Sequence, residues 1–257
     1  MKRALLCLAV AFLVAGPIGP GLPAWAAEPV CRRVSHEGQG YSVCTADLRR
    51  HAVRLFWKAA DGDPYGGFRR LVPEAGPNLL AAMNAGMYDP ALAPVGLYVE
   101  SGRELKPVNT AGGEGNFHLK PNGIFFVEKG RAGVAETGAY LRRRPRPDFA
   151  TQSGPMLVIG GRIHPKISQD GPSKKLRNGV GVRDPRTIVF AISDGPVSFG
   201  AFARLFRDAL GCRDALYLDG SVSSLYAPEL GRRDGLLPLG PLVAIMNRPD
   251  QAAVTRP

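Results

Sequence analysis

The segment from Ser198 to Gly220 reads SFGAFARLFRDALGCRDALYLDG, and its pattern joins one helix to one buried strand. Ser198 is a residue type that caps helices, and Gly211 suits the left-handed conformation that ends them. Apolar residues between the two recur at spacings of three and four, which predicts a helix with one buried aromatic face. The run Ala215–Leu218 has the length and composition of a buried strand. Asp219 follows it, so the segment ends in a polar turn at the end of a strand.

Outward from this segment, the chain is a series of short apolar runs separated by turn residues. Its 257 residues include 32 Gly and 23 Pro, a composition that favours many short strands over long helices. A second, weaker helix is expected from Asn78 to Met83. We therefore predict an α+β fold of mixed, mostly antiparallel sheets with few packed helices, in a single domain. The other runs expected as strands are 53–57, 124–127, 187–192 and 242–246, with a hairpin over 156–163.

The first 26 residues have the pattern of a secretory signal peptide. Lys2 and Arg3 precede an apolar run over residues 4–15, and the small-residue site Ala24-Trp25-Ala26 follows a stretch rich in Gly and Pro. The alternative is a membrane anchor, but twelve helical residues span only about 18 Å, short of the ~30 Å hydrocarbon core. We therefore expect a periplasmic or secreted protein with no stable transmembrane segment after cleavage.

Three cysteines remain beyond the predicted signal peptide. Cys31 and Cys44 flank a turn-rich stretch, and a disulfide between them suits an oxidising compartment. Cys212 is left over; it lies at a helix end before an apolar strand, which is more typical of a buried inert thiol than of a nucleophile. We divide the chain into the signal peptide at 1–26, an N-terminal extension with the first strands at 27–75, and a main domain at 76–250.

The chain is basic, and its charge favours anionic partners. Cleavage after Ala26 removes two cations and no acids, which lowers the net charge from +11 to +9. Nucleic acid is excluded by the predicted export and by the longest cationic cluster, Arg142–Arg146, which contains a proline and has few aromatic neighbours. This cluster is interpreted as a solvated loop, with contact to an envelope polymer as the alternative.

Most standard catalytic and metal-binding patterns are missing from the sequence. The four histidines have no short spacing that would place two on one helix face, so no zinc site is predicted. Neither a phosphate-binding loop nor a Gly-x-Ser-x-Gly motif occurs. No cofactor is expected, although a divalent cation between Asp194 and Asp219 is left open.

What remains is a set of glycine-containing polar segments at predicted strand ends. Glycines let backbone amides approach a ligand closely, while Asn, Ser, Arg and Asp supply polar groups at the mouth of a rigid sheet. Each segment alone is typical of a turn. The segments are Asn84–Asp89, Lys120–Gly123, Gln152–Pro155, Arg177–Gly181, Ser193–Gly195 and Leu218–Ser224.

Taken in order, these segments resemble the phosphodiester glycosidase family, and in particular its bacterial periplasmic branch. The resemblance extends over roughly residues 80–245 and rests on the order and spacing of the motifs rather than on any one of them. It implies that residues 76–250 form a phosphodiester glycosidase-like domain. The activity that it implies is hydrolysis of the bond between the anomeric carbon of a sugar and a phosphodiester, in envelope or extracellular glycans.

This reaction implies two oppositely charged groups in one site. The leaving phosphate needs positive charge, and the resemblance assigns Arg177, whose guanidinium can hold two oxygens at once. Positive charge builds on the sugar ring as the bond breaks, which calls for a carboxylate. Asp219 is the first candidate to stabilise that charge or to activate water, and Asp194 is the second. For both, a turn-closing role is the alternative.

The remaining site residues are expected to bind the substrate. The residues expected to orient sugar hydroxyls are Asn84, Ser153, Ser223 and Ser224. The backbone amides around Gly154 and Gly179 are expected to donate hydrogen bonds to the phosphate. Further contacts with the substrate are expected from Gly86 and Asn122.

Two other functions remain open at this stage. A non-catalytic periplasmic protein could use the same site to bind an anionic glycan or envelope polymer. A structural or adaptor module could instead meet membrane lipid through the basic face around Arg142–Arg146. In every case the expected partner is anionic, a phosphorylated or otherwise acidic glycan being preferred.

Overall fold

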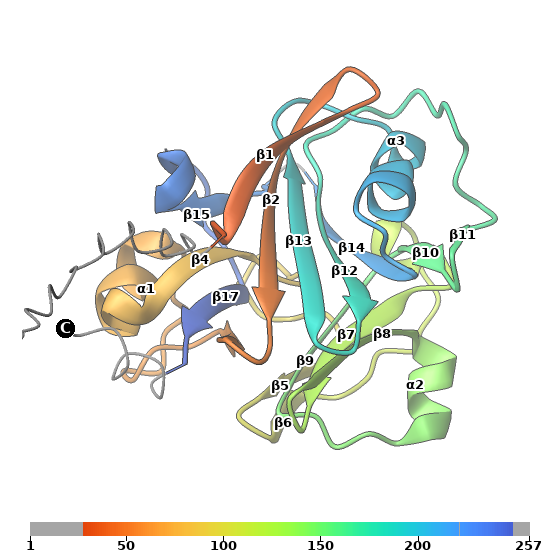
Figure 1. Cartoon of the computed structure of the whole chain (residues 1–257). Helices are drawn as coiled ribbons and strands as arrows, with labels where there is room; N and C mark the ends of the chain where they lie inside the picture. The colour runs from red at the N-terminus through yellow and green to blue at the C-terminus, as the bar shows by residue number, and fades with distance from the viewer. Residues whose placement is uncertain (1–27, 221, 249–257) are drawn as a thin grey trace, which may run out of the picture.

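The computed structural model describes residues 28–220 and 222–248, and it has the predicted α+β fold in a single domain (Figure 1). The predicted signal peptide lies outside the described residues. Neighbouring strands are antiparallel throughout the three sheets of this part of the chain. Within the same residues, no helix combines the length and apolarity required to cross a bilayer.

The largest sheet has seven strands and contains the strand that ends the sequence segment described first. Its middle strands carry the register that matters for the site: Asn178 of β12 pairs with Asp219 of β14 and with Ile192 of β13. The strands, in spatial order, are β1 (Cys31–His36), β2 (Gln39–Asp47), β13 (Thr187–Ser193), β12 (Asn178–Asp184), β14 (Asp214–Asp219), β10 (Met156–Ile159) and β11 (Arg162–Ile163).

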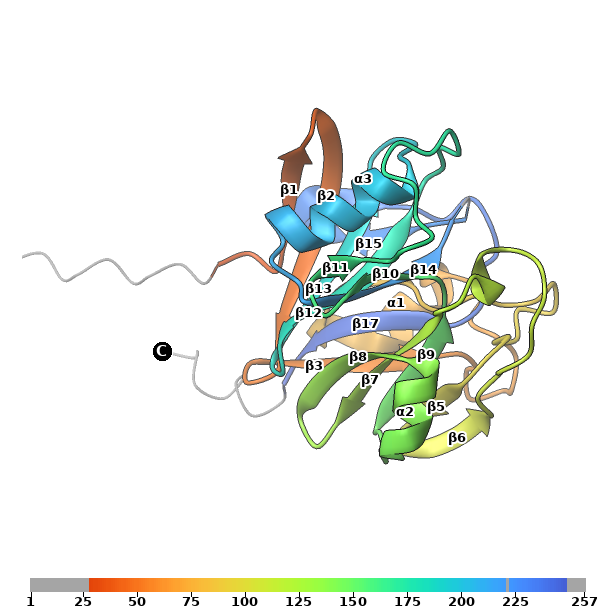
Figure 2. The same ribbon diagram turned by 90° about the vertical axis from the view of Figure 1, so that its right-hand side faces the viewer.

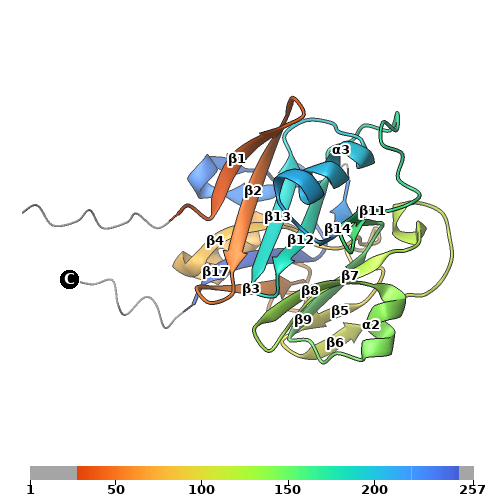
Figure 3. The same ribbon diagram turned by 45° about the vertical axis from the view of Figure 1, so that its right-hand side comes forward.

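Two five-stranded sheets pack against one face of this sheet (Figure 3). The second sheet has the order β16 (Arg232–Arg233), β15 (Leu225–Ala227), β4 (Leu79–Asn84), β17 (Leu242–Asn247) and β3 (His51–Phe56). The third has the order β6 (Arg103–Lys106), β5 (Tyr98–Glu100), β9 (Phe149–Ser153), β7 (Gly123–Glu128) and β8 (Arg131–Glu136).

The central core lies between the three sheets, and each sheet has one helix on its outer face (Figure 2). Leu216 and Leu218 of β14 point into the central core, while Ala215 and Tyr217 point toward α3 on the other face, as the two-residue period of a strand requires. The α-helices are α1 (Phe68–Ala75), α2 (Thr137–Arg143) and α3 (Phe199–Arg204). The short 3-10 helices are η1 (Gly76–Asn78), η2 (Asn116–His118) and η4 (Pro228–Leu230), and η3 (Leu205–Ala209) is a π-helix that continues α3.

The predicted helix after Ser198 is confirmed. The Ser198 hydroxyl accepts a hydrogen bond from the Ala201 amide at 3.1 Å, and Gly211 has the expected positive φ of 64°. The aromatic face of this helix packs closely on β12 at Gly179. A Cβ added at Gly179 would lie 2.8 Å from the carbonyl oxygen of Leu216 and 3.1 Å from the Phe202 ring.

The prediction of a helix from Asn78 to Met83 is wrong, because residues 79–83 lie in β4. An apolar run of this length fits either a buried strand or a helix turn. The run forms a strand because it pairs with β17 on one side and with β15 on the other. The helix nearest in sequence is α1, which ends at Ala75 before this run begins.

The disulfide between Cys31 and Cys44 is confirmed. It joins β1 to β2 at one end of their ladder. Cys212 is buried, and burial raises the pKa of its thiol to about 12, so it is an unreactive core residue. The strands of residues 27–75 are integral to the sheets, since β2 pairs with β13 and β3 pairs with β17.

Candidate functional site

One strand end from each of the three sheets contributes to a single polar cluster. Asn84 ends β4, Ser153 ends β9 and Asp219 ends β14. The Asn84 side-chain amide donates to Asp219 Oδ2 at 3.3 Å, and the Ser153 hydroxyl donates to the carbonyl oxygen of Leu218 at 2.7 Å. The cluster therefore lies where the sheets meet, and it brings together residues that were predicted from the sequence to share one site.

Asp219 is a half-buried carboxylate held by two hydrogen bonds. Besides the Asn84 amide, the backbone N–H of Gly220 donates to its Oδ1 at 2.7 Å. Burial raises the pKa of this carboxyl to about 6, and the two hydrogen bonds lower it only in part. A carboxyl that changes charge near neutral pH is suited to proton transfer or to stabilising positive charge.

Asn178 connects the cluster, and it is not among the site residues predicted from the sequence. Its side-chain amide donates to both the backbone oxygen (2.8 Å) and Oδ1 (3.0 Å) of Asn84. Its Oδ1 accepts the backbone N–H of Asp219 at 2.8 Å. Asn84 Oδ1 also accepts the Ser224 amide at 2.9 Å. Both asparagines are fully buried, so they fix the carboxylate in place. The available signal was the position of Asn178, next to Arg177 at the start of a strand.

The predicted serines lie at the cluster, with their hydroxyl protons used internally. The Ser223 hydroxyl donates to the carbonyl oxygen of Gly220 at 2.5 Å, and that of Ser224 donates to Val222 at 3.0 Å. Ser223 and Ser224 thus bind backbone oxygens that follow Asp219, and Ser153 binds the one that precedes it. Each hydroxyl oxygen retains acceptor capacity, which a ligand hydroxyl could use.

Arg177 lies directly before β12 and is fully buried, with 0% of its surface exposed. Its Nε donates to the carbonyl oxygen of Val197 and its Nη2 to that of Ser173, both at 2.9 Å. The guanidinium stacks on Phe199, with Cζ 3.6 Å from the ring centroid. Its Nη1 has no hydrogen-bond partner within residues 28–220 and 222–248. The two-oxygen fork expected for a phosphate is therefore occupied, and Nη1, the nitrogen without a partner among the described residues, is itself buried.

Two tyrosines border Asp219 and were not predicted as site residues. The ring of Tyr217 contacts the guanidinium of Arg177, whose Cζ is 5.5 Å from the centroid of the tyrosine ring. Its phenol oxygen lies close to Gly220: a Cβ added at Gly220 would be 2.6 Å from this oxygen. The Tyr88 hydroxyl donates to the carbonyl oxygen of Pro238 at 3.0 Å. Burial raises the pKa of both tyrosines to about 12, and the charge of Asp219 adds to the rise. Tyr88 closes the Asn-x-Gly-x-Tyr segment, so a sequence signal for it was present.

Asp194 is held apart from Asp219 by different partners. Its Oδ1 accepts hydrogen bonds from the Ser42 hydroxyl and from Arg232 Nη1, both at 2.9 Å, and Arg33 lies 3.9 Å from its Oδ2. This is an ion-pair network at the end of β13. Asp219 has no part in it, so the structure does not bring the two carboxylates together. In the described residues, no group of three or more His, Cys, Asp or Glu side chains could hold a metal ion.

The other predicted positions are accounted for by packing. Asn122 is buried, donates to the carbonyl oxygen of Phe117 at 2.9 Å and accepts from the Thr137 hydroxyl at 2.8 Å. A Cβ at Gly154 would lie 2.7 Å from that of Asn122, and one at Gly86 would lie 2.4 Å from the Gln152 carbonyl oxygen. Gly179 lies inside β12 and pairs with β13 and β14. These residues support the loops around the cluster.

Comparisons with known proteins agree with the family resemblance that the motifs indicated. A family model for phosphodiester glycosidases matches residues 77–257. The uncharacterized protein YigE of Escherichia coli (strain K12) is 36% identical over 184 residues, which cover 71% of this chain and 72% of that protein.

Solved structures share the fold at low sequence identity. The catalytic domain of zebrafish N-acetylglucosamine-1-phosphodiester alpha-N-acetylglucosaminidase, auto-inhibited by its pro-peptide, has a TM-score of 0.56 and 14% identity, over 85% of this chain and 82% of that one. A putative exported protein of Burkholderia pseudomallei has a TM-score of 0.51 and 14% identity, over 81% and 74%. Because the family model covers well over half of the sequence, and because YigE is similar over most of both lengths, the chain belongs to the phosphodiester glycosidase family.

Proposed function

We propose that this protein is an exported hydrolase that cleaves the bond between a sugar and a phosphodiester, with Asp219 as its catalytic carboxylate. The observation that carries the proposal is the half-buried Asp219 side chain, held by Asn84 and Gly220 and with its pKa raised to about 6. Family membership supports the reaction class. The disulfide between Cys31 and Cys44 supports an extracytoplasmic location.

Asp219 acts in its ionised form. Above pH about 6 its carboxylate is charged, and it either stabilises positive charge on the sugar ring or accepts a proton from the attacking water. Both roles need the geometry that Asn84 and Asn178 impose, because a misdirected carboxylate loses most of its effect.

Arg177 supplies positive charge on the leaving-group side. Its Nη1 is the guanidinium nitrogen left without a partner among the described residues. The guanidinium charge lies next to the ring of Tyr217, and Tyr217 precedes Asp219 by two residues in β14. The phosphate already leaves as an anion, so it needs positive charge more than a proton. In this proposal Ser223 and Ser224 contact sugar hydroxyls, while the buried Asn84 holds Asp219 in place.

Turnover of a chromogenic sugar phosphodiester tests the assignment of Asp219. We expect Asp219→Asn to lower kcat by at least about a hundredfold, the usual size of such a contribution. In the unsubstituted protein, kcat/KM should rise with pH through about 6 as Asp219 ionises. Asp214→Asn is the matched control, because it changes an aspartate at the other end of the same strand.

Equal turnover by the Asp219 variant would refute the role of this carboxylate. No turnover by any form, combined with salt-sensitive binding of an anionic glycan that Arg177→Lys weakens, would support the non-catalytic alternative. Reaction in heavy-oxygen water distinguishes the bond: label on the sugar indicates attack at the anomeric carbon, and label on the phosphate indicates cleavage at phosphorus.

A further inference from the structure

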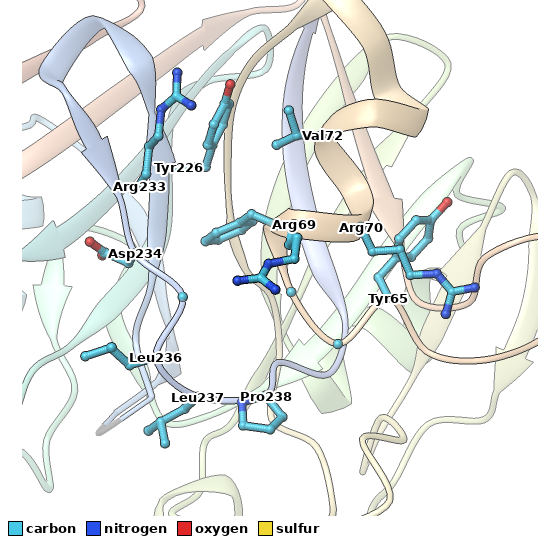
Figure 4. A pocket seen from close by; sticks show the side chains of 14 residues that line it. Tyr65, Arg69, Arg70, Val72, Tyr226, Arg233, Asp234, Leu236, Leu237 and Pro238 are labelled. Atoms are coloured by element: carbon cyan, nitrogen blue, oxygen red, sulfur yellow. The ribbon is translucent and has the colours of Figure 1, made fainter.

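A recess lies between the start of α1 and the loop that follows β16. Its volume is about 670 Å³, and side chains from both segments line it (Figure 4). Pro238 belongs to its wall and also accepts the Tyr88 hydrogen bond. We call residues 233–238 the rim loop. This recess has no role in the hydrolysis proposed above.

The rim loop exposes two adjacent leucines to solvent. Leu236 is 99% exposed and Leu237 is 49% exposed. Among the described residues, the one other large apolar side chain in this class is Leu141 on α2, at 42%. Single exposed leucines are ordinary on protein surfaces, but two adjacent exposed leucines in one loop are typical of a contact site for an apolar partner.

Unneutralised arginines flank this apolar tip. Arg69 and Arg233 are exposed, and no carboxylate within residues 28–220 and 222–248 lies within salt-bridge distance of either. The nearby acids are engaged elsewhere, because Asp61 pairs with Arg70 and Asp234 binds Arg232 and the Leu225 amide. In Figure 4 the guanidinium of Arg69 points into the space between α1 and the rim loop.

Apolar side chains surrounded by free cations are the combination that binds an anionic membrane surface. The leucines can enter the boundary between headgroups and acyl chains, while guanidinium groups bind lipid phosphates with two hydrogen bonds each. A soluble acidic glycan would use the arginines and the aromatic wall of the recess, but it would gain little from two leucines that project into water. The pair of leucines therefore favours lipid over glycan.

We propose that the rim loop docks this protein on an anionic phospholipid bilayer, with Leu236 and Leu237 inserted and with Arg69 and Arg233 on the headgroup phosphates. Two leucines and two arginines support weak, reversible and salt-sensitive attachment rather than anchoring. Docking would hold the Asp219 cluster close to the membrane, because Tyr88 lies near Asp219 and also donates a hydrogen bond to Pro238 of the rim loop.

Co-sedimentation with vesicles tests the proposal. We expect the protein to pellet with vesicles of phosphatidylcholine and phosphatidylglycerol, and to remain in solution with phosphatidylcholine alone or at high salt. The variants Leu236→Ser/Leu237→Ser and Arg69→Ala/Arg233→Ala should each lower the partition coefficient by about tenfold or more. The variant Leu237→Trp should show a blue-shifted tryptophan emission when anionic vesicles are added.

Leu141→Ser/Arg142→Ala is the matched control, because it removes an exposed leucine and an adjacent arginine on a different helix. This variant should pellet like the unsubstituted protein, and circular dichroism should be the same for all forms.

Failure of the unsubstituted protein to pellet, or an equal loss in the control, would overturn the proposal. Binding of a soluble acidic glycan that depends on the two arginines but not on the leucines would overturn it in favour of a glycan site. Hydrolysis of a soluble substrate should be unaffected by the rim-loop variants, so this test and that of Asp219 fail independently.

Discussion

At the scale of single residues, Asp219 destabilises the folded chain above pH 6 as a consequence of its position. Burial raises its carboxyl pKa from 3.8 to about 6, so the folded state binds a proton more tightly than the unfolded state does. The free energy of unfolding therefore falls as pH rises through the interval between these two values, and the penalty is complete above it. Active sites commonly retain such unfavourable charges because the chemistry needs them.

Replacement of Asp219 by Asn should therefore stabilise the protein while it removes activity. At pH 7 we expect the free energy of unfolding to rise by about 1–2 kcal/mol, since the pKa difference is worth about 3 kcal/mol and one hydrogen bond from Asn84 is lost. At pH 4 the gain should vanish, because the native carboxyl is then protonated. Urea denaturation at both pH values measures this, with Asp214→Asn as the control. A variant that is less stable at pH 7 would contradict the burial of an ionised carboxylate.

At the scale of elements, the close approach of α3 to the seven-stranded sheet depends on the glycines of β12. Phe202 and Phe206 occupy the space that side chains at Gly179 and Gly181 would need. The same strand presents Val180 to the central core on its other face. Small residues on one face and larger ones on the other thus allow β12 to pack tightly on both sides.

Gly179→Ala should destabilise the protein by about 1–3 kcal/mol, because its Cβ would press on backbone and on an aromatic ring at the same time. Gly195→Ala is the control, since a Cβ there meets nothing within 4 Å; it should change the free energy of unfolding by less than about 0.5 kcal/mol. Chemical denaturation measures both. Loss of turnover in Gly179→Ala with unchanged stability would instead support a direct contact of this glycine with the substrate.

At the scale of the whole molecule, the fold extends beyond the region that resembles the family. The family model begins at residue 77, yet β2 pairs with β13 over seven residues and β3 pairs with β17 over six. Val53 and Leu55 of β3, and Cys44 and Ala46 of β2, belong to the central core. The first strands are therefore part of the same cooperative unit as the Asp219 cluster.

A chain that starts at residue 76 should fail to fold. It would expose the edges of β13 and β17 and would lose one side of the central core. The free energy lost with these contacts exceeds the free energy of unfolding of an ordinary domain. A chain that starts at residue 28 is the control and should fold. Circular dichroism and thermal melting distinguish the two outcomes. A cooperative melt of the shorter chain would show that residues 28–75 are an appendage.

The sequence by itself determined the local features of this protein. The helix after Ser198, the apolar strand runs, the hairpin over 156–163 and the disulfide followed from patterns that span a few residues, and periodicity and capping act over that range. Motif order over the chain was sufficient to recognise the family. Local pattern failed for the run 78–83, which suits a strand or a helix equally.

Only the tertiary structure decided which polar residues meet. Asn84 bonds to Asn178 across 94 positions and to Asp219 across 135, while Asp194, a comparable aspartate at a comparable strand end, turns to Arg232 instead. The burial that raises the pKa of Asp219, and the stacking that encloses Arg177, come from residues of several sheets and loops. Solvent exclusion depends on everything packed around a group, and a short stretch of sequence contains only a small part of those surroundings.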